Sequence, residues 1–328
     1  MADMKIAILD DYMKIADSLA DWTSLPDNVH VDFFTEKLPE GIDARAQILA
    51  NYDVLVLTRE RTPLPRTLLE QLRKLKFIAS PEMHNRVLDF DYCREKGIPV
   101  SGTTPRPSPT FELTWALILA LAKNVTIDDR AMRGGHWQTV VGTEIRNKTL
   151  GVIGLGRIGS EVAKVGNAFG MKVIAWSENM TEERAAECGA NLVTKDDLFR
   201  RSDYVVVMVI QSNRTIGLVG AYEIGLMKPN AYLVNPARGP IVDEAALLDA
   251  LKNNRIAGAG LDVYTDEPLP TNHPFRSLPN TVLMPHVAGF TKEHYAHWYN
   301  GMLEDVQSWI DGKVINEIHG SGMVAARV

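Results

Sequence analysis

Residues 151–179 read GVIGLGRIGSEVAKVGNAFGMKVIAWSEN, and this stretch decides the fold. It begins with an apolar strand, passes through a glycine turn into an amphipathic helix, and ends in a second apolar strand. Glycines spaced G-x-G-x-x-G in this context are typical of a dinucleotide-binding βαβ unit. The stretch therefore predicts a parallel sheet that binds a nucleotide.

The glycines of this turn have separate tasks. Gly154 permits the tight turn, Gly156 lets the backbone approach a pyrophosphate, and Gly159 lets the helix pack closely on the strand. The anion would then rest on the helix N-terminus, beside Arg157 and Ile158. We expect all five residues to contact the cofactor.

Composition describes an ordinary globular chain that is too long for one core. The chain has 328 residues, of which 45% are hydrophobic and 23% charged, so two domains are expected. A net charge of -6 and a sequence pI near 5.8 argue against a nucleic-acid partner. Cys93 and Cys188 lack the spacing of metal ligands, which predicts no metal site, no disulfide framework and a reducing compartment.

The sequence predicts neither export nor a membrane partner. The first residues, MADMKIAILDDY, lack a basic region followed by a cleavage site and are predicted to form a strand. The longest apolar stretch, residues 113–122, is too short to span a bilayer. We therefore expect a cytoplasmic protein.

Strands and helices alternate in two series, which predicts two doubly wound parallel sheets. In the first series we expect a helix at 64–75 and strands at 5–9, 29–34, 54–58 and 77–79. In the second we expect strands at 150–153, 173–176, 204–209, 231–235, 258–262 and 281–284. The stretch GTTPRPSP at 102–109 is the expected crossing, and a helix at 293–310 returns to the first lobe. The predicted domains are 1–109 with 292–328, and 110–291.

Polar residues that follow apolar strands are the candidates for chemistry, because open α/β sheets bind ligands beyond the carboxyl ends of their strands. Arg238 follows one strand and could fork two hydrogen bonds to a carboxylate. Asp262 and Glu267 follow the next, and His286 the last, so a histidine and a carboxylate could form a general acid/base pair. Taken singly, Arg238 could instead be a surface arginine and Asp262 a helix or loop cap. Glu267 could lie in a solvated turn, and His286 could be an ordinary loop histidine.

The order of these motifs resembles the D-2-hydroxyacid dehydrogenase family, also called the D-isomer-specific 2-hydroxyacid dehydrogenases. The matching segments are the glycine turn, VIAWS, NPARGPIVDEAAL, LDVYTDEPLP and PHVAGFT. The resemblance implies a flavodoxin-like substrate domain and a Rossmann NAD(P)-binding domain, with a cleft between them. It also implies that Arg238 binds and polarises the substrate, His286 passes a proton, Glu267 holds His286, and Asp262 lies by the nicotinamide carboxamide.

Further contacts and a dimer follow from the same resemblance. Additional cofactor contacts are implied at Ser177, Ile210, Pro236, Ala237 and Gly289. A homodimer is implied through residues 120–149, where the apolar side chains are Val125, Ile127, Met132 and Trp137.

Two departures from the family pattern concern specificity. Ser177 stands where an acidic residue usually binds the ribose hydroxyls, while Glu178 would repel a 2′-phosphate, so NAD is favoured and NADP stays possible. In FIASPEMHNRVLD, Pro81 and Glu82 occupy the place of a usual glycine. Substrate contacts are therefore expected at Arg59, Glu82 and Met83, with Arg61 as an alternative anion contact.

Together these features predict an NAD(P)-dependent oxidoreductase that interconverts a 2-oxo acid and a D-2-hydroxy acid. The acid itself stays open among glyoxylate, hydroxypyruvate, a phosphorylated acid and an aromatic keto acid. The alternative is a dinucleotide-sensing regulator, similar to a corepressor, on the same fold.

Overall fold

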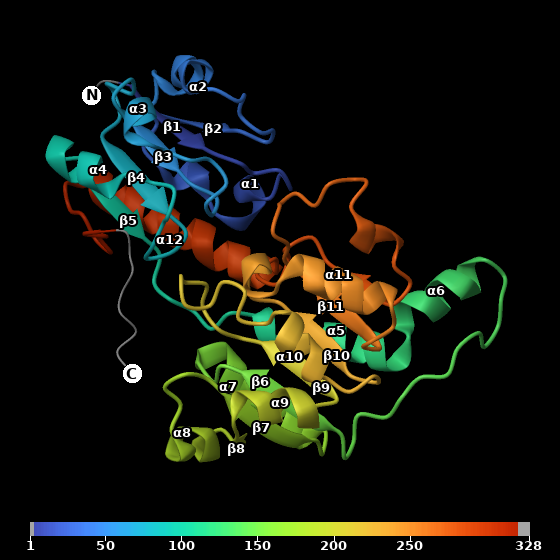
Figure 1. Ribbon diagram of the computed structural model, residues 1–328. Coiled ribbons are helices and arrows are strands. Elements are labelled where there is room, and N and C mark those ends of the chain that lie inside the picture. The colour runs from blue at the N-terminus through green and yellow to red at the C-terminus, as the bar shows by residue number, and fades with distance from the viewer. Residues whose placement is uncertain (1–2, 321–328) are drawn as a thin grey trace. The chain divides into compact units, whose positions relative to one another are not determined.

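A computed structural model describes residues 3–320 (Figure 1). The chain divides into two compact units. The first comprises the segment up to Arg106 and the segment from Phe290 onward, and the second is Pro107–Gly289. The first break falls inside the proline-rich stretch 102–109, and both breaks lie a few residues before the boundaries expected from the sequence.

The first unit is built on five parallel strands in the order β2-β1-β3-β4-β5. The strands are β1 (Met4–Ile8), β2 (Val29–Phe33), β3 (Val54–Val56), β4 (Phe77–Ser80) and β5 (Val100–Gly102). This order is that of flavodoxin, so the predicted flavodoxin-like sheet is confirmed. The strand order reverses between β1 and β3, which places the ligand-binding edge of this sheet beyond their carboxyl ends.

Helices cover both faces of this sheet, as a parallel sheet requires. They are α1 (Ala16–Leu19), α2 (Ile42–Leu49), α3 (Arg66–Leu69), α4 (Phe90–Lys96) and α12 (Lys292–Ile310), with the 3-10 turn η1 (Trp22–Ser24). Alternate β1 residues serve opposite faces: Ile6 and Ile8 pack with α1 and α12, while Ala7 packs with α2, α3 and α4. Figure 1 shows α12 running along β4 and β5.

The helix expected at 64–75 is wrong in its extent, because only Arg66–Leu69 is helical. Leu64 forms a β-bridge with Leu88, and Pro65 precedes the helix. Beyond the helix, Leu72 and Leu75 are held in turns whose amides bond three residues back. Their side chains are still buried, so successive turns satisfy the apolar spacing that predicted one continuous helix.

The second unit is built on seven parallel strands in the order β12-β11-β10-β9-β6-β7-β8. The strands are β6 (Thr149–Ile153), β7 (Lys172–Trp176), β8 (Asn191–Leu192), β9 (Tyr204–Val207), β10 (Tyr232–Asn235), β11 (Gly258–Leu261) and β12 (Thr281–Leu283). Read from β8, this is the Rossmann order with one more strand, which confirms the prediction. Its order reverses between β6 and β9.

Helices also cover both faces of the second sheet. They are α5 (Thr110–Lys123), α6 (Val125–Arg133), α7 (Arg157–Ala168), α8 (Glu182–Glu187), α9 (Lys195–Arg201), α10 (Ala221–Leu226) and α11 (Glu244–Lys252), with the 3-10 turns η2 (Gly239–Ile241) and η3 (Pro274–Ser277). Residues of α5 and α7 form one core with the sheet, and residues of α9, α10 and α11 form the other.

No single helix within residues 3–320 is long and apolar enough to cross a membrane. The consecutive helices α5 and α6 meet that test of length and composition only as a pair, and they are bent by 64° at their junction. Leu117 and Ile118 of α5 lie in the core of the second unit, as expected for a buried helix.

Candidate active site

The glycine turn lies at the carboxyl end of β6, where the order of the second sheet reverses. Gly154 has a φ of +96°, and a Cβ there would lie 2.8 Å from Cγ1 of Val209, just beyond β9. A Cβ on Gly159 would overlap the carbonyl oxygen of Gly154. Both positions therefore require glycine, one for its backbone conformation and both for close packing.

The third glycine leaves space where a cofactor would bind. A Cβ on Gly156 would meet no atom within 4 Å, although Gly156 directly precedes the 12-residue helix α7. The amides of the first turn of α7 and its dipole favour an anion at that position. Arg157 is exposed and Ile158 half-buried in this turn. The residues present thus fit a pyrophosphate.

The other expected cofactor contacts follow strands of the same sheet at the same edge. Ser177 follows β7, Pro236 and Ala237 follow β10, and Gly289 lies beyond β12. Ile210 lies beyond β9 and is 73% exposed, which is unusual for so apolar a side chain. An apolar side chain exposed at this edge suits a cofactor ring.

Arg238 is presented by a turn that Asn235 organises. The Asn235 side chain is buried, donates to the carbonyl oxygen of Arg238 at 3.0 Å, and accepts from the Ala237 amide at 3.1 Å. The Arg238 guanidinium donates to the carbonyl oxygen of Ala237 at 2.7 Å and stays half-buried. The turn after β10 is therefore fixed by one amide side chain.

A close backbone contact joins this turn to the loop after β11. A Cβ on Gly239 would overlap the carbonyl group of Tyr264. The amide of Tyr264 donates to Oε1 of Glu267 at 2.9 Å, and its hydroxyl donates to the carbonyl oxygen of Met284 at 2.9 Å. Tyr264 thus links three loops at the carboxyl edge of the sheet.

Glu267 and His286 form the hydrogen bond expected of a general acid/base pair. Oε2 of Glu267 lies 2.6 Å from Nδ1 of His286. Burial alone would raise the pKa of Glu267, but the bonds from His286 and the Tyr264 amide, together with the charges of His286 and Arg238, hold that pKa below its usual value. The carboxylate is therefore ionised at neutral pH and orients the imidazole.

Asp262 fixes the loop that carries His286. Its carboxylate is fully buried and accepts from the amides of Val287 at 2.8 Å and Ala288 at 3.0 Å. His286 itself has a φ of +57°, a conformation that few histidines adopt without support. The structure therefore gives Asp262 a positioning role, and its contact with the carboxamide stays a prediction.

The expected substrate contacts lie in the first unit. Arg59, with a φ of +61°, and Arg61 both follow β3, and each guanidinium lies over the Phe290 ring, at 5.4 and 5.3 Å. Arg61 also donates to the carbonyl oxygen of Asp10 at 2.7 Å and lies 4.8 Å from the Tyr12 ring. Arg61 thus bridges β1 and β3 at the point where this sheet reverses order.

Glu82 and Met83 follow β4 in the same unit. The Glu82 carboxylate pairs with Nε2 of His84 at 3.3 Å, and Met83 packs against the core. The Glu82 carboxylate is therefore held by a side chain of its own loop.

The family model for the D-isomer specific 2-hydroxyacid dehydrogenase NAD-binding domain matches residues 115–288 of this chain. The chain belongs to the D-isomer-specific 2-hydroxyacid dehydrogenase family. The match spans the glycine turn and ends just beyond His286, so it covers Arg238, Asp262, Glu267 and His286. It supports NAD(P) as the cofactor.

Named 2-hydroxyacid dehydrogenases are similar to most of the chain. The glyoxylate reductase of Aeropyrum pernix is 39% identical, over 75% of this chain and 77% of that protein. The D-3-phosphoglycerate dehydrogenase of Archaeoglobus fulgidus is 36% identical, over 80% of this chain and 50% of that protein. The crystal structure of a phosphoglycerate oxidoreductase from Vibrio cholerae superposes with a TM-score of 0.86 at 30% identity, covering 94% of this chain and 99% of that one.

Three residues that matter to this 2-hydroxyacid dehydrogenase site were not singled out in the sequence. Asn235 and Tyr264 lie inside the recognised motifs, and their neighbours in the sequence indicated the site. The hydrogen bonds that Asn235 and Tyr264 themselves form could not be predicted from the sequence. Arg184, in α8, bonds to the carbonyl oxygen of Leu155 in the glycine turn, and no spacing rule predicts that contact. Among residues 3–320 no group of three or more His, Cys, Asp or Glu side chains could hold a metal ion.

Proposed function

We propose that the protein is an NAD(P)-dependent dehydrogenase that interconverts a 2-oxo acid and a D-2-hydroxy acid. The observation that carries the proposal is the hydrogen bond of 2.6 Å between Glu267 and His286, in the unit that also carries the glycine turn. Arg238 and Asp262 support it, the first as a cation at the same edge and the second as the anchor of the His286 loop.

The residues have separate tasks in the proposed reduction. The glycine turn would hold the pyrophosphate of the cofactor, whose nicotinamide would supply the hydride that the carbonyl carbon accepts. Arg238 binds the substrate carboxylate and polarises the 2-oxo group. Because Nδ1 of His286 is bonded to Glu267, Nε2 is assigned to donate the proton to the carbonyl oxygen. The ionised Glu267 stabilises the protonated imidazole before transfer and keeps its orientation after transfer.

The substrate class follows from Arg238. Its cation suits an acid that carries a carboxylate beside the 2-oxo group. Glu82 opposes a second negative charge in its own loop. The similarity to glyoxylate reductases favours a short 2-oxo acid such as glyoxylate.

A dinucleotide-sensing regulator is not favoured. The relatives at 36–39% identity are named as a reductase and a dehydrogenase. The acid/base pair is also complete in this chain, which a sensor would not require.

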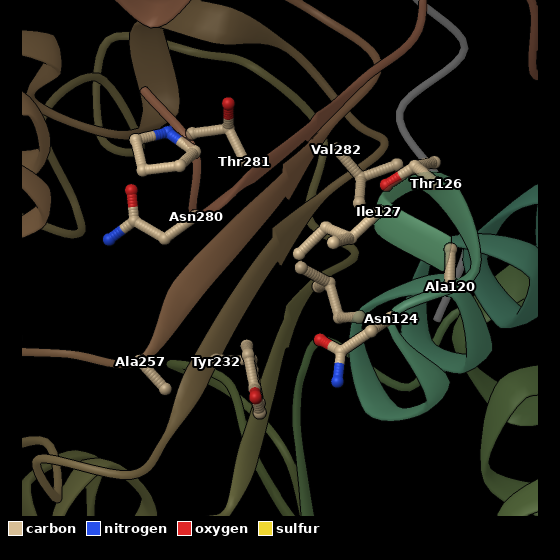
Figure 2. A pocket seen from close by; sticks show the side chains of 11 residues that line it. Ala120, Asn124, Thr126, Ile127, Tyr232, Ala257, Asn280, Thr281 and Val282 are labelled. Carbon is tan, nitrogen blue, oxygen red and sulfur yellow. The ribbon is translucent and has the colours of Figure 1, made fainter. Parts of the chain in front are cut away.

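We also propose a homodimer formed through residues 120–149. Apolar side chains are unusually exposed there: Val125 by 53%, Met132 by 52%, Trp137 by 74% and Val141 by 93%. A pocket of about 180 Å³ adjoins them, between the helices α5 and α6 and the amino-terminal ends of β10 and β12 (Figure 2). This pocket lies at the opposite edge of the sheet from the glycine turn. A monomeric mass in solution at micromolar concentration would contradict the dimer.

The cytoplasm is the compartment that we propose, because Cys93 and Cys188 are both free thiols. Recovery of the protein from a secreted or periplasmic fraction would contradict this assignment.

The function is tested by following NADH and NADPH oxidation with a panel of 2-oxo acids. The panel comprises glyoxylate, hydroxypyruvate, a phosphorylated acid and an aromatic keto acid. We expect turnover on at least one short acid, and a loss of roughly 10²-fold or more in kcat/KM for Arg238→Ala. Arg238→Lys should recover little, because an ammonium cannot form the bidentate contact. Equal turnover by Arg238→Ala would contradict the proposed role.

A further inference from the structure

Arg184 lies at the glycine turn although it comes from a different βα segment. Its Nη2 donates to the carbonyl oxygen of Leu155 at 3.0 Å, and Leu155 stands between Gly154 and Gly156. Its Nη1 forms an ion pair with Glu187 at 3.2 Å, and 45% of the Arg184 side chain is exposed. The guanidinium is therefore anchored beside the turn while part of it faces solvent.

The end of β7 offers a hydroxyl where a carboxylate would select NAD. Ser177 follows β7 directly, and its carbonyl oxygen accepts from the Met180 amide at 3.1 Å in a turn. A carboxylate at this position binds the ribose hydroxyls and repels a 2′-phosphate. A serine hydroxyl can instead donate a hydrogen bond to phosphate. The exposed Glu178 opposes a phosphate by its charge.

Arg184 is better suited to bind an anion than Lys195, the neighbouring cation. Lys195 lies 5.7 Å from the centre of the Trp176 ring and pairs with Glu223 at 2.8 Å. That pair is largely buried, with 27% and 14% of the two side chains exposed. The pair of Arg184 with Glu187 is more exposed and can be exchanged at little cost.

We propose that Arg184 and Ser177 bind the 2′-phosphate of NADP(H), so that this enzyme uses NADP(H) as well as NAD(H). The proposal rests on the proposed function, through its NAD(P) site at the glycine turn. Arg184 exchanges its bond with Glu187 for a bidentate contact with phosphate oxygens, while its bond with Leu155 keeps it in place. Ser177 adds a neutral donor at the end of β7. The NAD preference expected from the sequence did not take account of Arg184, a cation that lies seven residues after Ser177 in the chain.

The test compares two fragments of the cofactor that differ only in the 2′-phosphate. Binding of adenosine 2′,5′-bisphosphate and adenosine 5′-monophosphate to the full chain is measured by calorimetry. The unmodified protein should bind the bisphosphate at least about tenfold more tightly, as a charge-assisted contact gives. In Arg184→Gln the two ligands should bind within about threefold of each other. Equal weakening of both ligands, or an unchanged ratio, would overturn the proposal.

Two further variants control the experiment. Arg200→Gln removes an arginine of similar exposure, 49%, which is paired with Asp196 on the neighbouring helix α9, and it should leave the ratio unchanged. Glu187→Gln removes the competing anion and should raise the ratio about two- to threefold. A ratio that falls in Glu187→Gln would contradict the exchange.

The ligands require no turnover, so this test and the test of the dehydrogenase can fail separately. A protein that binds both fragments equally overturns only the role of Arg184. A protein that binds neither contradicts the cofactor site itself, and with it the proposed function. If the fragments behave as expected, kcat/KM for NADPH should fall at least about tenfold in Arg184→Gln, with a change below about threefold for NADH.

Discussion

A fully buried carboxylate lies in each unit, and the two carboxylates are held in opposite ways. Asp262 in the second unit is 0% exposed, and each of its oxygens accepts a backbone amide of the His286 loop. Asp305 in the first unit, on α12, is also 0% exposed. Its Oδ1 accepts from Asn316 at 2.8 Å, whereas Oδ2 has no hydrogen-bond partner among residues 3–320.

The difference shows how burial can either build a site or weaken a fold. Two amides replace the water that Asp262 loses, so its charge holds a strained loop in place. The single hydrogen bond from the Asn316 side chain does not replace the water that Asp305 loses. Burial therefore raises the pKa of Asp305 to about 7 despite this bond. The first carboxylate therefore holds the loop of the proposed proton donor, and the second is expected to make stability depend on pH.

The largest effect is expected from removing the imidazole of His286, whose loop Asp262 holds in place. His286→Ala should lower kcat by roughly 10²–10⁴-fold, because the proton donor is lost while the glycine turn is untouched. Steady-state kinetics with the best 2-oxo acid, together with the Kd of NADH, measures this. A variant that keeps full kcat would show that His286 is not the acid.

Asp262→Asn removes one of the two oxygens that accept amides of the His286 loop, and it should have the next largest effect. An amide has only one acceptor oxygen, so the Val287 or Ala288 amide loses its partner and the loop with its φ of +57° at His286 relaxes. We expect kcat to fall by about 10–100-fold, by analogy with other groups that hold a catalytic side chain in place. Asp243→Asn, which changes a helix cap on α11, is the control. Equal losses in both variants would indicate a general loss of stability.

These two residues also show what sequence can reveal. The strand order of both sheets, the glycine turn and the Glu267–His286 pair could be predicted, because motif spacing places such residues at the carboxyl ends of parallel strands. The hydrogen bonds of Asp262 with the amides of Val287 and Ala288 could not be predicted, since these residues lie 25 and 26 positions further along the chain in a different loop. The contact between Arg184 and Leu155, and the broken helix after Pro65, likewise depend on packing across the sheet.

The contrast between the two buried acids is tested directly by Asp305→Asn. The pKa of Asp305 is raised in the folded protein, from an ordinary value near 3.8 to about 7. The folded state therefore holds this proton more tightly, and stability falls as pH rises from about 4 to 7. At pH 8 the variant should be more stable than the unmodified protein by about 2–4 kcal/mol, with little difference at pH 4.

Melting temperatures of both proteins from pH 4 to 8 measure this difference. Glu304→Gln removes an exposed charge that contributes least to the raised pKa of Asp305, so this variant should show only a small part of the pH dependence. If the advantage of Asp305→Asn were the same at every pH, the burial of an unsatisfied carboxylate would not be its cause.

The smallest effect is expected at the carboxyl edge of the first sheet. Arg61→Ala should raise KM for the 2-oxo acid by about tenfold with little change in kcat, because it removes an anion contact and no reacting group. A KM that stays within about twofold of the unmodified protein would contradict an anion contact at Arg61.

The central claim is that the second unit carries a complete site for hydride transfer coupled to proton transfer by His286. The most direct test is the stoichiometry and chirality of the product formed by the unmodified protein from NADH or NADPH and its best 2-oxo acid. Where the acid yields a chiral product, we predict one D-2-hydroxy acid formed for each cofactor oxidised. Saturable cofactor binding without oxidation on any acid of the panel, or an L-product, would contradict the account.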